Sequence, residues 1–129
     1  MNNLDKESIT GIAALLVHAA KIDEIYSEHE KSLIKDFIKS YLKDDDVDEV
    51  LKKAEEIEKN SNQLLNFTNI IKQNSMDVKK DILEHLWKVV ISDKTVDQYE
   101  SNLLRRICGL IYVPDKISAE IKLKLLNSK

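Results

Sequence analysis

Residues 12–41 read IAALLVHAAKIDEIYSEHEKSLIKDFIKSY, and residues 82–111 read ILEHLWKVVISDKTVDQYESNLLRRICGLI. In each stretch an Asp stands seven positions before a Glu, because Asp23 precedes Glu30 and Asp93 precedes Glu100. The shift from position 23 to position 93 also aligns apolar residues that recur at the spacing of one helix face. These are Ile12, Leu16, Ala19, Ala20, Leu33, Ile34, Phe37, Ile38 and Tyr41 in the first stretch, and Ile82, Leu86, Val89, Val90, Leu103, Leu104, Ile107, Cys108 and Ile111 in the second. We interpret the pattern as an internal duplication of a helix, a short acidic turn and a second helix.

Two copies of this unit predict a compact arrangement, because extended arrays usually contain three or more repeats. We expect one helical domain over residues 1–129 with pseudo-twofold character, and a chain of 129 residues is long enough to form one core. The first repeat covers about 5–42, the connecting helices about 44–74, and the second repeat with a C-terminal helix about 75–129. The whole chain contains only two Gly and one Pro, the residues that form the tight turns between strands. The expected fold class is therefore all-α, with about seven helices.

The 3.6-residue periodicity also predicts the individual helices. A first helix over about 5–22 has apolar residues on two faces and should be central. Ser27 and Glu30 have the spacing of a capping box, Asp97 and Glu100 hold the same places in the second repeat, and the run Asp44–Asp46 should cap the third helix. The remaining predicted helices are 27–42, 44–60, 63–72, 77–92 with Trp87 as its largest anchor, 97–112, and a seventh with Pro114 in its first turn.

The bulk properties favour a cytoplasmic protein. The net charge is only −3 with both signs interleaved, which argues against nucleic acid as a principal partner. The longest uncharged stretch, 8–20, is shorter than the roughly 20 apolar residues of a membrane span. Asp5 and Glu7 stand where a signal peptide would be basic. The single Cys, Cys108, excludes an internal disulfide and lies in the repeated apolar stripe, so we expect a buried thiol.

Residue sets that support catalysis are missing from the sequence. There is no Gly-rich phosphate loop, none of the three His has a Glu three positions before it, and no two His are four apart, which excludes the usual helical di-iron and zinc-protease motifs. We expect His18 to be partly buried with one satisfied nitrogen, His29 to be exposed, and His85 to pair with Asp81 one turn earlier. The chain is therefore predicted not to be an enzyme.

The two acidic turns have two interpretations. Helix capping accounts for Glu30 and Glu100, and the Asp residues can bond nearby turn amides. Alternatively, Asp23, Glu30, Asp93 and Glu100 supply carboxylates for a divalent cation such as Ca²⁺ or Mg²⁺, or for a basic partner. The pattern is not an EF-hand, because it lacks alternating Asp or Asn and a central Gly. Both interpretations remain open, and they are compatible with each other.

The stretch 82–114 resembles the TerB-like family associated with tellurite resistance. In that family a helix L-x-x-L-W-x-V-A is followed by an acidic A-D-G turn, a Glu and a helix containing L-x-R-R. The resemblance is carried by Trp87, Asp93, Glu100, Leu103, Leu104, Arg105 and Arg106 in the second repeat, and by Asp23, Glu30 and Leu33 in the first. It implies an all-helical, non-enzymatic fold linked to stress and tellurite resistance, divalent cations and complexes at the inner face of the membrane. Glu24 and Lys94 replace the usual turn Gly, and Lys94 next to Asp93 makes the first turn the better candidate site.

The leading hypothesis is a cytoplasmic, non-enzymatic helical module that binds a protein partner, with its two acidic turns contacting a basic partner or a divalent cation. A second hypothesis is an oligomeric scaffold that uses the aromatic residues Tyr26, Tyr99 and Tyr112. A third is a metal-dependent hydrolase that uses the same carboxylates together with His18 or His85.

Overall fold

The central helix of the structure is α1 (Lys6–Ala20), which packs against α2 (Glu28–Tyr41), α3 (Val47–Asn60), α4 (Leu65–Lys72) and α5 (Met76–Ile91). The structure is a computed structural model that describes residues 5–21, 26–42, 46–61, 65–91 and 98–127, with only the backbone described for 98–101. Every position of α1 from Ile9 to Val17 is buried, as expected for a helix with apolar residues on two faces. The predicted central place of the first helix is confirmed.

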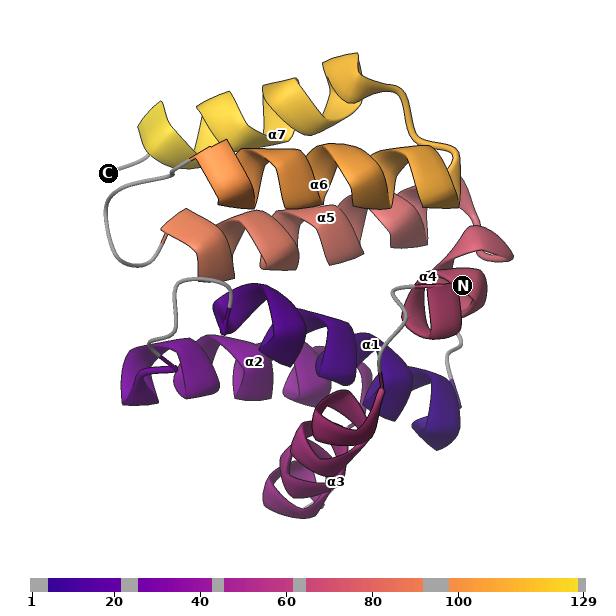
Figure 1. Cartoon of the computed structure of the whole chain (residues 1–129), viewed down its shortest axis with the longest axis vertical. Helices are drawn as coiled ribbons and strands as arrows, with labels where there is room; N and C mark the ends of the chain where they lie inside the picture. The colour runs from indigo at the N-terminus through magenta and orange to yellow at the C-terminus, as the bar shows by residue number, and fades with distance from the viewer. Residues whose placement is uncertain (1–4, 22–25, 43–45, 62–64, 92–97, 128–129) are drawn as a thin grey trace.

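Two groups of helices face each other across this core (Figure 1). In that view α1, α2 and α3 form the lower group, while α5, α6 (Gln98–Ile111) and α7 (Asp115–Asn127) form the upper one. The short α4 lies beside the join and contacts α1, α5 and α6. All elements assigned within the described ranges are helices, so the predicted all-α class and the seven helices are confirmed.

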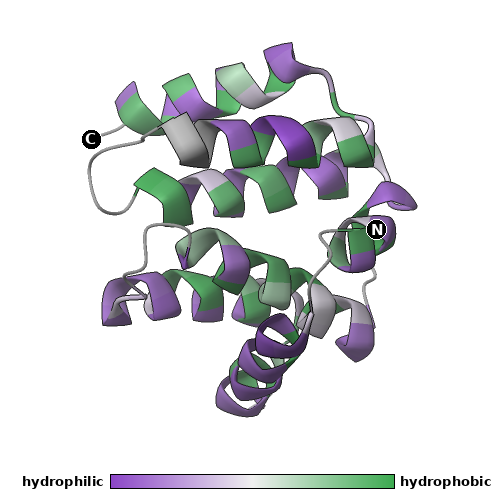
Figure 2. Cartoon of the chain, viewed as in Figure 1, coloured by the Kyte–Doolittle hydropathy of each residue, from purple (hydrophilic) through white to green (hydrophobic). Residues whose placement is uncertain are grey.

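The core is built from the repeated apolar stripes. Of the nine aligned pairs, seven are buried in both copies, while Leu33 and Tyr41 are partly buried and pack against the core. In Figure 2 the green of hydrophobic residues is prominent along α1 and recurs on α5 and α6, whereas α3 is mostly purple. Cys108 is buried, as predicted, and this burial raises the pKa of its thiol. The duplication that suggested these stripes stays a prediction.

The helix starts show which local signals were correctly interpreted. The Asp5 carboxylate accepts a hydrogen bond from the Ser8 amide at 2.7 Å and caps α1. The prediction that the Asp44–Asp46 run caps the third helix is wrong for Asp46, whose side chain makes no capping hydrogen bond. Asp46 has a ψ of 13° rather than the extended backbone of a cap, and its carboxylate instead accepts from Lys6 Nζ at 3.1 Å. Asp44 and Asp45 lie outside the described residues.

For most helices the observed first and last residues otherwise differ from the predicted ones by one or two positions. This is the usual uncertainty in where a helix begins and ends. Pro114 immediately precedes α7, and its carbonyl accepts from the Ile117 amide at 3.0 Å. Ile117, Ile121 and Leu125 pack against the core as the predicted stripe of the seventh helix. None of the described helices has both the length and the apolar composition needed to cross a bilayer.

Candidate functional site

The structure describes the side chain of only one of the four predicted cation ligands, Glu30. Asp23 and Asp93 lie outside the described residues, and the side chain of Glu100 is not described. Glu30 is therefore the one proposed cation ligand whose surroundings can be examined. Among the described side chains, no three His, Cys, Asp or Glu residues gather in a metal-binding arrangement. The proposed cation site as a set stays a prediction.

Glu30 lies in the first turn of α2 and is only 4% exposed. Its Oε1 accepts from the Ser27 amide at 2.8 Å and from Ser27 Oγ at 3.2 Å, while Ser27 Oγ accepts from the Glu30 amide at 3.1 Å. This reciprocal pair is the capping box that the sequence predicted. The burial and orientation of Glu30 are thus explained by the start of α2 without a bound ion.

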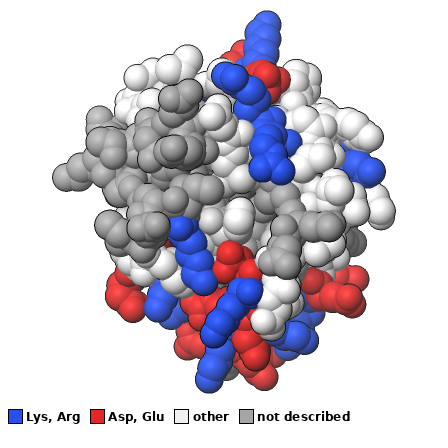
Figure 3. Space-filling model, viewed as in Figure 1, with Lys and Arg blue, Asp and Glu red and all other residues white. Residues whose placement is uncertain are grey.

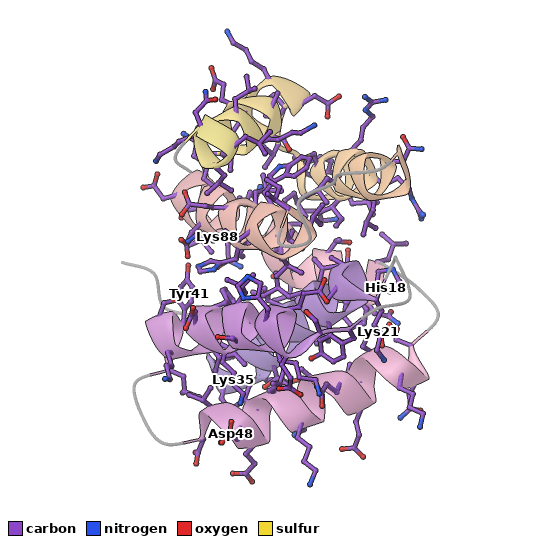
Figure 4. All side chains as sticks on the ribbon, turned by 90° about the vertical axis from the view of Figure 1, so that its left-hand side faces the viewer. His18, Lys21, Lys35, Tyr41, Asp48 and Lys88 are labelled. Atoms are coloured by element: carbon purple, nitrogen blue, oxygen red, sulfur yellow. The ribbon has the colours of Figure 1, made fainter. Side chains whose placement is uncertain are left out.

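Side chains from α3 reach toward the end of α1, beside the first acidic turn. Glu58 Oε2 lies 3.3 Å from His18 Nδ1, and Glu58 Oε1 accepts from Lys21 Nζ at 3.0 Å. His18 is therefore partly exposed with one partnered nitrogen, as predicted. Figure 4 labels His18 and Lys21 one above the other on the right of the view, above α3. These contacts join the end of the central helix to α3.

Tyr26 follows the first acidic turn and is held by the same helix. Its hydroxyl donates to Glu55 Oε2 at 2.7 Å, and burial together with this bond to Glu55 raises the pKa of the phenol. Lys31 Nζ lies 5.1 Å and Lys21 Nζ 6.0 Å from the centre of the ring. A half-buried, hydrogen-bonded Tyr26 is a poor free contact for the proposed scaffold, and the side chain of Tyr99 is not described.

A shallow hollow of about 360 Å³ surrounds Tyr26. Four lysines and two glutamates line it with the ring, namely Lys21, Lys31, Lys52, Lys59, Glu55 and Glu56. Sequence reasoning missed this cluster of lysines, although Lys52 and Lys59 are seven residues apart and so share one face of α3. The surroundings of Tyr26 therefore present both signs of charge.

A family model described as "Tellurite resistance protein TerB" matches residues 10–123, from α1 into α7. The chain belongs to the TerB family. The resemblance inferred from the repeat is thereby confirmed, and it extends across the middle helices. No curated protein matches the chain, and neither does any solved structure.

Two further hollows of this TerB-family chain lie between α1, α3 and α4. Their volumes are about 480 and 890 Å³, and both include Glu7, Lys53 and Ile57 in their walls. Apolar side chains form the remaining base, and charged groups of both signs form the rim: Val50, Phe67 and Ile70, with Lys6, Glu49 and Glu56. Because the rims carry charged groups of both signs, the lining alone indicates no single class of ligand.

A polar bridge joins the lower helices of the TerB fold to the upper ones. The Tyr41 hydroxyl donates to Asp81 Oδ2 at 2.5 Å, and Asp81 Oδ1 lies 3.7 Å from His85 Nε2, so the predicted pairing of Asp81 and His85 is confirmed. Figure 4 shows Tyr41 at the junction between α2 and α5. The His85 ring also packs edge-on against Phe37, with 5.2 Å between ring centres. The bridge holds α2 to α5.

The pH dependence of stability should report on this bridge. Burial lowers the pKa of His85 below its ordinary 6.5, with Lys88 acting in the same direction, while Asp81, Glu84 and Asp36 oppose the shift. Because the unfolded chain then binds a proton more readily than the folded one, the contribution of neutral His85 is fully present above pH 6.5 and is lost as the pH falls below it.

Urea unfolding at a series of pH values between 5 and 7.5 measures this contribution. We expect the free energy of unfolding to fall on acidification in the wild type and to fall less steeply in His85→Gln. His29→Gln is the matched control, since it removes a His from an exposed position, and its slope should lie closer to the wild type than that of His85→Gln. Equal slopes in the wild type and His85→Gln would contradict the expectation.

Proposed function

We propose that the protein is a cytoplasmic, non-enzymatic interaction module of the TerB family. Its binding region comprises the turn between α1 and α2 with the adjoining face of α3. The ligand is a basic segment of a partner protein, and a divalent cation such as Ca²⁺ or Mg²⁺ is the alternative ligand of the same carboxylates. Partner complexes at the inner face of the membrane fit this role. The observation that carries the proposal is the excess of acidic side chains in residues 1–61, among which Glu28 and Asp48 are well exposed.

The distribution of charge supports a basic partner on this side. Residues 1–61 contain 15 acidic and 9 basic side chains, while residues 62–129 contain 8 acidic and 11 basic ones. Several acids on the lower helices are well exposed, since the side chains of Glu28 and Asp48 are 91% and 85% accessible. The lower part of Figure 3 accordingly shows red groups gathered among blue ones. Electrostatic attraction of this kind steers a basic partner to the correct face and speeds association.

The contacts around the turn favour a polypeptide over a cation as the ligand. Lys21 already pairs with Glu58, and Lys31 pairs with Glu28 at 3.6 Å. A small ion would have to displace these lysines from their carboxylates, whereas the basic groups of a protein segment can form the same kind of ion pair with those carboxylates. Asp23, which lies outside the described residues, adds a carboxylate to this region on sequence grounds.

The test is an NMR titration that follows backbone amides with a lysine-rich peptide, and separately with Ca²⁺, Mg²⁺ and Zn²⁺. We expect the peptide to shift amides at the end of α1, the start of α2 and the facing side of α3, and Asp23→Asn to weaken its binding. Shifts with a metal alone at submillimolar concentration would favour the cation instead. If neither ligand produces a localised shift, the proposal is wrong.

Ser27→Ala is the matched control, because it removes the cap beside the proposed site without changing charge. Loss of the capping hydroxyl should lower the free energy of unfolding by about 0.5–2 kcal/mol. Binding of the lysine-rich peptide should stay unchanged as long as the variant is folded. If Ser27→Ala weakens binding as much as Asp23→Asn does, the Asp23 carboxylate affects binding by supporting the start of α2 and not by contacting the ligand.

A further inference from the structure

The outward residues of α4 and α6 form a surface of the opposite character, which we term the α4–α6 face. The two helices pack side by side, and none of the described side chains on this face is acidic. It consists of Lys72 from α4, with Arg105, Arg106, Gly109 and Tyr112 along and just after α6. Where α6 faces the viewer in Figure 3, blue side chains lie among white and grey ones. The nearest described acids in sequence, Asp77 and Asp115, belong to α5 and α7.

Tyr112 has an unfavourable backbone conformation on this face. Its φ of 62° is left-handed, and it is the one described non-glycine residue with a positive φ. The Val113 amide donates to the Cys108 carbonyl at 2.9 Å, which is the helix-ending motif that usually places Gly at the position of Tyr112. The left-handed conformation strains a bulky L-residue. A Tyr is therefore present where the fold alone favours Gly.

Burial of the Tyr112 ring in the core does not offset the cost of this backbone conformation. The residue is 68% exposed, the most exposed large hydrophobic side chain among those described. Lys72 Nζ lies 5.6 Å from the centre of the ring and so connects α4 with the end of α6. Strained backbone retained at an exposed aromatic residue is typical of binding surfaces, where Tyr and Arg supply much of the energy.

Arg105 and Arg106 extend the face along α6. Both are exposed, and no described carboxylate lies within the 4.0 Å of an ion pair from either guanidinium. Gly109 follows one turn later, and a Cβ added there would meet nothing within 4 Å. The surface between the arginines and Tyr112 is therefore open to an approaching chain. Arginine forks bind carboxylates through two parallel hydrogen bonds.

We propose that the α4–α6 face binds an acidic segment of a partner protein. Asp or Glu carboxylates of that segment pair with Arg105, Arg106 and Lys72, while an apolar side chain rests on the Tyr112 ring. Three basic groups beside one exposed aromatic ring match a short acidic peptide, whereas nucleic-acid surfaces usually present a denser array of Lys and Arg. This site lies on different helices from the region around the first acidic turn and takes a ligand of opposite charge.

The probe is a fluorescein-labelled peptide of repeating Glu-Glu-Leu, with a Gln-Gln-Leu peptide as its uncharged control, measured by fluorescence anisotropy. We expect the Glu peptide to bind and the double variant Arg105→Ala/Arg106→Ala to bind it about tenfold more weakly. Lys116→Ala/Lys124→Ala on α7 removes the same charge from exposed positions and should change the affinity less than about twofold. Equal losses in the two double variants would overturn the proposal, since attraction would then follow net charge alone.

Tyr112→Gly provides a second readout that a purely structural residue would not give. Relief of the left-handed strain should raise the melting temperature by about 3–5 °C, while binding of the Glu peptide weakens. A more stable variant with unchanged affinity would remove Tyr112 from the site. Tighter binding of a single-stranded oligonucleotide than of the Glu peptide would assign the face to nucleic acid instead. Neither result bears on the lysine-rich peptide and cation titrations around Asp23, so the two proposals fail separately.

Discussion

Trp87→Ala is expected to lower the free energy of unfolding by about 3–5 kcal/mol, the range for removing a large aromatic side chain from a core. Trp87 is only 4% exposed on α5. Its Nε1 donates to Ser118 Oγ at 2.9 Å, and Lys122 Nζ lies 5.3 Å from the ring centre, so one side chain holds two successive turns of α7. Since a domain of this size is stable by only about 5–15 kcal/mol, the loss would be a large share of the total.

Urea unfolding followed by circular dichroism measures this loss, and two further variants divide it. Trp87→Phe keeps most of the apolar contact but leaves the Ser118 hydroxyl without the indole, so its loss should be clearly smaller. Ser118→Ala leaves the buried indole N–H unpaired and should cost about 1–3 kcal/mol. Hydrogen exchange should show α7 opening before α5 in Trp87→Ala. A loss below about 1 kcal/mol would contradict the anchor role of Trp87.

Phe37→Ala should be comparably damaging, at about 3–5 kcal/mol. Phe37 is fully buried on α2, with ring centres 5.2 Å from both Tyr41 and His85. It therefore lies beneath the polar bridge that joins the lower helices to α5. Phe37→Leu keeps an apolar side chain of similar reach and should cost less than about 1.5 kcal/mol.

The same variant should alter the pH dependence, because removing the Phe37 ring opens the His85 side chain to water. The burial that lowers the pKa of His85 is then reduced, so the loss of stability below pH 6.5 should be shallower in Phe37→Ala than in the wild type. Urea midpoints at pH 5 and pH 7 for both proteins give the comparison. An unchanged slope would mean that packing of Phe37 against His85 does not cause the lowered pKa of His85.

The sequence predicted those features that depend on neighbours within one or two helical turns. The buried stripes of α1 and α6, the Ser27–Glu30 capping box and the pairing of Asp81 with His85 all follow from spacing along a helix. The error at Asp46 has a tertiary cause, because Lys6 from a distant helix contacts the carboxylate that the local pattern assigned to capping. Local signals cannot show such competition between partners.

The candidate surfaces were the least predictable feature for the same reason. The lysines around Tyr26 come from α1, α2 and α3 and their connections, and they meet only once those helices pack. The left-handed backbone of Tyr112 could not be predicted either. A Gly at that position would have indicated a helix end, whereas a Tyr does not. The sequence identified the Asp and Glu of the acidic turns, but the character of the surfaces beside them depends on tertiary contacts.

The burial of Cys108 limits the cysteine chemistry that is open to this chain. Thiol-based reduction requires an accessible thiolate, and here the only sulfhydryl of the 129 residues is enclosed by the core with its pKa raised by that burial. Cys108 is therefore expected to react slowly with oxidising and alkylating reagents while the protein is folded.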